Sequence, residues 1–179
     1  MIRSTLAAVP KRPPALLAKA IVFGVTTFVV SLVSLVATAL LTAPLMPAKD
    51  IHPDLGDSSF WLAIVGGAGY LALIGVLALA IGTIIRSSAG SISAALGLIL
   101  VLPVIVQILA GVTRADWARN LGSFLPSSAG GRMYSYAPTA TTPAEGIVSL
   151  DPGQGLLVLV VWFVVFFAIG AVLLKRRDA

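Results

Sequence analysis

The sequence contains no cysteine and little charge, and both absences narrow what it can do. Without cysteine there is no disulfide, no thiolate nucleophile and no cysteine-based metal site in its 179 residues. Charged residues make up 11% of the chain, against roughly 25% in soluble globular domains. The sequence also lacks the G-x-x-x-x-G-K-[ST], G-x-S-x-G and H-E-x-x-H motifs, which excludes ATP binding by a phosphate loop and two common kinds of hydrolase.

Four long apolar runs contain none of the Asp, Glu, Lys and Arg residues: 20–43, 60–85, 92–112 and 155–174. A helix needs about 20 apolar residues to cross a bilayer core, and each run reaches that length. The sequence therefore predicts an all-α fold, a polytopic membrane helical bundle with four transmembrane helices. The loop 113–154 is expected to lie outside and to be partly helical.

The charges between the runs favour one orientation. With the N-terminus inside, eight basic residues against one acidic residue give +7 on the inner side, and four basic against six acidic residues give −2 on the outer side. This distribution obeys the positive-inside rule and accounts for the net charge of +5 without a nucleic-acid partner. We expect a multi-pass protein of the cell (plasma) membrane with both termini in the cytoplasm.

The residues before the first run have the pattern of a short amphipathic helix, with three apolar side chains on one face: Ile2, Leu6 and Val9. Pro10 ends the pattern, and a stiff basic bend follows at residues 11–14. We therefore divide the chain into a cytoplasmic arm (1–19) and a transmembrane domain (20–179). The arm is either a basic anchor at the lipid headgroups, which physical chemistry alone favours, or a helix that docks on a partner protein.

The third run contains two residues that are unusual at mid-membrane depth, Pro103 and Gln107. The proline frees a carbonyl near residue 99 and bends the helix, and the glutamine is the only amide side chain in the four runs. Gln107 either forms an interhelical hydrogen bond of about 0.6 kcal/mol, the commoner role, or lines a translocation path together with Pro103. The short link 86–91 makes the second and third helices antiparallel neighbours.

The outer loop has an amphipathic segment in which three apolar residues face away from Arg119, Asn120 and Ser123: Trp117, Leu121 and Phe124. This pattern predicts a helix that lies in the membrane interface or dips back into it. The following residues 126–131 (PSSAGG) are expected to break that helix. Asp151 and Pro152 supply an N-cap and a first-turn proline for the last span.

One cluster in the acidic loop 44–59 has side chains that could bind a metal: Asp50, His52, Asp54 and Asp57. Its spacing is a weak signature, and a solvated connector explains it more simply. We expect no metal and no cofactor. Because no carboxylate, lysine or histidine lies inside a run, the sequence also argues against a proton-driven carrier or an intramembrane enzyme.

Several segments resemble the permease subunits of type-2 ABC exporters, especially those of actinobacteria: residues 2–13 (IRSTLAAVPKRP), 17–20 (LAKA), 85–90 (IRSSAG) and 124–130 (FLPSSAG). The resemblance extends over the whole chain, and the first twelve residues carry most of it. It implies a subunit of an ATP-driven exporter that forms the translocation path, docks a separate ABC ATPase and pairs with itself or with another permease. ATP hydrolysis is then expected on the ATPase chain.

The resemblance also assigns roles to residues. It implies that a cytoplasmic coupling helix contacts the ATPase through Ile2, Arg3, Ser4, Thr5, Leu6, Val9, Lys11 and Arg12. It implies that an outer, partly re-entrant segment contains Trp117, Leu121, Phe124, Pro126, Ser127, Ser128 and Gly130.

Permeases of this class have six membrane helices, and the four runs correspond to the last four. We therefore expect the first two helices to be missing, through a misplaced start or a truncated gene. The alternative is a stand-alone four-helix scaffold or regulatory protein, or a permease fragment without function. The charge-free interior suggests a hydrophobic or amphiphilic cargo.

Overall fold

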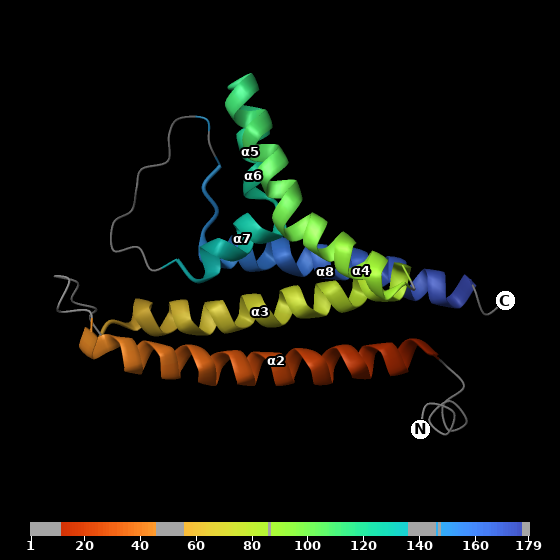
Figure 1. Cartoon of the computed structure of the whole chain (residues 1–179), viewed down its shortest axis with the longest axis horizontal. Coiled ribbons are helices and arrows are strands. Elements are labelled where there is room, and N and C mark those ends of the chain that lie inside the picture. Colours follow the sequence, from red (N-terminus) through yellow and green to blue (C-terminus); the bar gives the residue numbers. More distant parts are fainter. Residues whose placement is uncertain (1–11, 46–55, 86, 136–145, 147, 177–179) are drawn as a thin grey trace.

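The computed structural model describes residues 12–45, 56–85, 87–135, 146 and 148–176, and this part of the chain contains helices and no β-strand. In chain order the elements are α2 (Arg12–Thr42), a 3-10 turn η1 (Ala43–Leu45), α3 (Ser58–Ile85), α4 (Ser88–Leu96), a π-helical segment η3 (Gly97–Val101), α5 (Leu102–Thr113), α6 (Asp116–Ser123), α7 (Pro126–Met133) and α8 (Pro152–Arg176). Figure 1 shows their arrangement.

Four helical stretches are long and apolar enough to cross a membrane: Ala15–Thr42, Ser58–Ile85, Ser88–Thr113 and Pro152–Leu173. The predicted all-α membrane bundle with four spans is confirmed. The helices begin earlier than the apolar runs, because polar and small residues at the membrane surface continue the same helical turns.

The predicted bend at residues 11–14 is wrong for the part that the structure describes, because α2 is one continuous helix from Arg12. Pro13 and Pro14 lie in its first turn. Proline is tolerated there, since the N–H that it lacks would have no intrahelical acceptor. Two adjacent prolines therefore begin the helix instead of bending the chain before it.

Helix α3 is the centre of the bundle and contacts α2, α4, α7 and α8. In Figure 1, α2, α3 and α8 run along the same long direction. Glycines allow α2 and α3 to approach closely: a Cβ added at Gly75 would lie 2.9 Å from Cε1 of Phe23, and one added at Gly24 would lie 3.1 Å from Cγ2 of Val76. Each helix thus supplies a small residue opposite a large one of its neighbour, which fits packing between membrane helices.

Helices α3 and α4 are neighbours, so the pairing predicted for the second and third spans is found in the first part of the third span and not in α5. The hydroxyl of Ser87 caps α4 by accepting a hydrogen bond from the backbone N–H of Gly90 (3.3 Å). Below this turn, Leu77 and Ile81 of α3 are buried against Ala95 of α4, and Trp162 of α8 packs on the same cluster. The turn therefore fixes the start of the third span, α4, against the body of the bundle.

Candidate functional site

The third span is broken where the sequence places a freed carbonyl. The π segment Gly97–Val101 ends with the backbone N–H of Leu102 donating to the carbonyl of Gly97, five residues earlier. Pro103 follows directly, and its missing N–H would leave the carbonyl of Ile99 without a partner in a regular α-helix. Segments of this kind are frequent at functional sites because they let a helix change direction.

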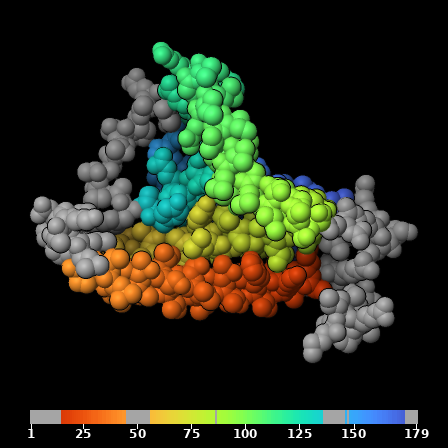
Figure 2. All heavy atoms as spheres, in the orientation of Figure 1, coloured from red at the N-terminus to blue at the C-terminus, as the bar shows by residue number. Residues whose placement is uncertain are grey.

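Beyond this break, α5 leaves the body of the bundle. Figures 1 and 2 show it projecting away from α2 and α3, and its contacts to other elements are chiefly with η3 and α6. Pro103 is buried at the base of α5, and the side chain of Gln107, one turn later, is exposed. Gln107 forms no hydrogen bond to another helix within the described ranges, and it lines a cavity between α5, α6 and α7.

The outer segment forms the amphipathic helix that its sequence predicts. Trp117 and Leu121 of α6 are exposed together with its C-cap residue Phe124, and Ala118 on the opposite face is fully buried. Arg119 and Ser123 of the polar face line the cavity beside Gln107. The apolar face of α6 is thus directed at the surroundings of the protein, and its polar face is directed at α5 and α7.

The turn between α6 and α7 lies deep in the bundle. The indole N–H of Trp162 donates to the backbone carbonyl of Phe124 at 3.0 Å. Trp162 is ten residues after Pro152, which is about 15 Å along α8 and close to the middle of that helix. This bond gives a partner to a carbonyl at the end of α6, where a bilayer would offer none. Nothing in the sequence pattern distinguishes Trp162 from its apolar neighbours.

The residues expected to break α6 do end it, and they also begin another helix. Pro126 occupies the first turn of α7. The N-cap residue Leu125 is buried, and so are three residues of the helix itself: Pro126, Ala129 and Gly130. The sequence pattern alone indicated only a break, because proline, serine and glycine are poor helix formers. Ser128 lines the cavity, and the buried hydroxyl of Ser127 has no hydrogen-bond partner within the residues described.

Helix α7 is wedged between α3 and α8, and glycines make room for it. A Cβ at Gly130 would overlap the ring of Tyr70, and a Cβ at Gly66 would overlap the carbonyl of Met133. On the other side, a Cβ at Gly155 would overlap the carbonyl of Ala129. Tyr70 lies 12 residues after Ser58, about 18 Å along α3. The outer segment therefore enters the bundle to about half the length of two spans.

A side-chain clamp connects α6 to the segment before α8. The Asn120 amide donates to the carbonyl of Gly146 (3.1 Å), and its oxygen accepts from the N–H of Val148 (2.8 Å). Helix α8 begins at Pro152, as the sequence predicts, and just before it the backbone N–H of Asp151 donates to Oε1 of Gln154 (3.1 Å). The polar pattern around Asn120 indicated an exposed face and not this pairing.

Other predicted residues lie outside the described part. This applies to Ile2 through Lys11 of the coupling segment and to Asp50, His52 and Asp54 of the acidic cluster, while Arg12 is the first residue of α2. Asp57 accepts a hydrogen bond from the N–H of Ser59 at the start of α3 (3.0 Å). Within the described ranges no group of three or more His, Cys, Asp or Glu residues could hold a metal.

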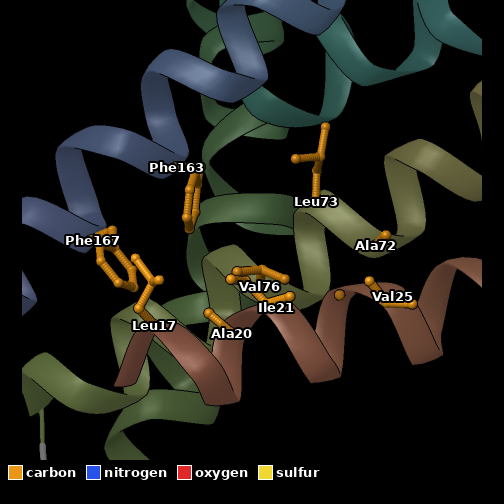
Figure 3. A pocket seen from close by; sticks show the side chains of 10 residues that line it. Leu17, Ala20, Ile21, Val25, Ala72, Leu73, Val76, Phe163 and Phe167 are labelled. Carbon is orange, nitrogen blue, oxygen red and sulfur yellow. The ribbon is translucent and has the colours of Figure 1, made fainter. Parts of the chain in front are cut away.

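A groove of about 420 Å³ lies between α2, α3 and α8. Figure 3 shows Phe163 and Phe167 of α8 facing Leu17 of α2 and Val76 of α3 across it. All ten lining residues are apolar, so the groove can accept a hydrocarbon chain or a hydrophobic side chain and offers nothing to a polar group.

The chain matches the family described as ABC-2 family transporter protein over residues 11–179. The chain belongs to this family. Comparisons with curated proteins and with solved structures found no match. The chain is therefore a multi-pass membrane permease of the ABC-2 class, a component of a transport system, and chains of this class associate with ABC ATPases.

Proposed function

We propose that this permease is the membrane-spanning subunit of an ATP-driven exporter in the cell membrane, where it works as one half of a permease pair. Family membership over residues 11–179 is the observation that carries the proposal. The charge distribution supports an orientation with both termini in the cytoplasm, because Lys and Arg predominate on that side.

The coupling to the ATPase is assigned to residues 2–12, which lead directly into α2 and include its first residue, Arg12. An amphipathic helix there would place Ile2, Leu6 and Val9 in a groove of the partner, and the basic residues would add electrostatic contacts. Closure of the ATPase pair would then move α2, which packs along α3, and the spans would rock between inward-open and outward-open arrangements.

The path is assigned to the broken third span. A helix with a π segment and a proline can bend there at low cost, and α5 has few neighbours to hold it in place. Bending would widen the space beside Gln107. The apolar grooves favour a hydrophobic or amphiphilic cargo, and vesicles that export only small hydrophilic solutes would refute this part.

Paired substitutions in the coupling segment test the proposal. Leu6→Asp puts a charge on the apolar face of the predicted helix, whereas Ala7→Asp, about 100° further round, puts the same charge off that face. With a partner ABC ATPase co-expressed, we expect Leu6→Asp to abolish co-purification and permease-dependent export, and Ala7→Asp to retain both. Equal effects of the two variants, or no co-purification of the unchanged chain, would contradict the proposal.

A further inference from the structure

A polar cavity lies at the outer end of the third span, between α5, α6 and α7. Its volume is about 340 Å³, and five of its nine lining residues have polar side chains: Gln107, Arg119, Ser123, Ser128 and Arg132. The groove of Figure 3 and the groove between α3 and η3 are lined by apolar residues throughout. This cavity is therefore chemically unlike the lipid-facing hollows of the same bundle.

The charge of the cavity is positive. No carboxylate lines it, and it has two guanidinium groups. Arg119 forms an ion pair with Asp116, one helical turn earlier. The distance between Nη1 of Arg119 and Oδ1 of Asp116 is 3.6 Å. Arg132, in the last turn of α7, has no acidic partner within the described ranges. One full positive charge is thus uncompensated, next to two serine hydroxyls that can donate hydrogen bonds.

The position of the cavity suits a group at the membrane surface. Gln107 is six residues before Thr113, where the span ends, which is about 9 Å along α5. Val106, Ala110 and Ala118 form an apolar wall of the cavity, and the side chains of Arg119 and Arg132 are exposed, so that an anion can reach them. The volume is near the low end of the roughly 300–1,000 Å³ of ligand sites, enough for a headgroup and not for a whole lipid.

We propose that this cavity binds a phosphate-type anion, with Arg132 as the principal contact and with Arg119, Ser123 and Ser128 as further donors. Arginine suits this role because its planar fork can donate two parallel hydrogen bonds to phosphate oxygens. The anion is either the headgroup of an anionic phospholipid or a water-soluble phosphate. The site does not depend on docking of an ATPase, and it can be tested on the permease alone.

The test uses the full chain in nanodiscs of phosphatidylcholine. One arm adds phosphatidylglycerol and counts lipids retained by native mass spectrometry, and the other measures radiolabelled inorganic phosphate by equilibrium dialysis. Loss of a hydrogen-bonded charge contact corresponds to about 10- to 100-fold weaker binding, which we expect for Arg132→Gln. Arg132→Lys keeps the charge without the fork, and we expect an intermediate loss. Arg114→Gln removes a charge from an exposed residue on the same side, outside the cavity, and is expected to leave binding unchanged.

Binding in the lipid arm alone identifies a headgroup, and binding in the phosphate arm alone identifies a soluble ligand. Either result supports the site if Arg132→Gln weakens it and Arg114→Gln does not. Equal binding by Arg132→Gln and the unchanged chain, an equal loss in Arg114→Gln, or no binding in both arms would overturn it. Circular dichroism checks that each variant is helical. If Arg132→Gln does not fold, Arg119→Gln is measured in its place. The expected loss of binding is then smaller, because Arg119 is already paired with Asp116.

Discussion

The close approach of α7 to α3 at Gly66 gives a quantitative prediction. A Cβ added at Gly66 would overlap the carbonyl oxygen of Met133 and lie 2.7 Å from its carbonyl carbon. These are backbone atoms at the end of α7, so no side-chain rotation can relieve the overlap. We therefore expect Gly66→Ala to push the outer segment away from α3.

The magnitude follows from two opposing effects. Overpacking of this kind costs about 1–3 kcal/mol, and replacing glycine by alanine within a helix gains about 1 kcal/mol. The net loss of unfolding free energy is then up to about 2 kcal/mol, which for a chain of this size lowers the melting temperature by up to about 8 °C.

The measurement is thermal unfolding of the purified permease in detergent, followed by circular dichroism. Gly111→Ala in α5 is the matched control, because a Cβ added at Gly111 would meet no atom within 4 Å. We expect Gly111→Ala to keep or raise the melting temperature. An equal shift in both variants, or stabilisation by Gly66→Ala, would refute the packing of α7 against α3.

Two further substitutions test the turn between α6 and α7 and the π segment of the third span. Trp162→Phe keeps a ring but removes the hydrogen bond to the Phe124 carbonyl, and it should cost about 1 kcal/mol in the same unfolding assay. The exposed Trp117, which has no hydrogen bond within the described residues, gives the control Trp117→Phe, and equal losses would contradict the role of the bond. Pro103→Ala restores an N–H donor, so it should convert the π segment to a regular helix and raise the unfolding free energy by up to about 3 kcal/mol. An unchanged melting temperature would show that the proline is not the cause of the break.

The spans could be predicted because apolar length alone determines which segments can cross a bilayer. The face of α6 could also be predicted, since Trp117, Leu121 and Phe124 recur at helical spacing and are exposed together. Pro103 likewise marked the position of the π segment. In each case the signal lies in neighbouring residues of one helix.

Helix α7 could not be predicted from local residues. Its sequence has proline, serines and glycines, and the helix is stabilised by contacts with residues far away in the chain, such as Tyr70 and Gly155. The hydrogen bond from Trp162 to Phe124 joins residues 38 positions apart, and the spacing of apolar residues along one helix cannot predict a contact between two distant segments. The bend expected at residues 11–14 was wrong because local rules for proline do not separate a helix start from a turn.

Labelling of single cysteines from either side of the membrane tests the central claim most directly, namely that the outer segment enters the bundle from the face opposite to the α3–α4 turn. Since the chain has no native cysteine, Ser135→Cys after α7 and Ser88→Cys at the start of α4 each give one label site. In intact cells an impermeant maleimide should label position 135, and position 88 only after permeabilisation. Labelling of both positions from the same side would contradict the account.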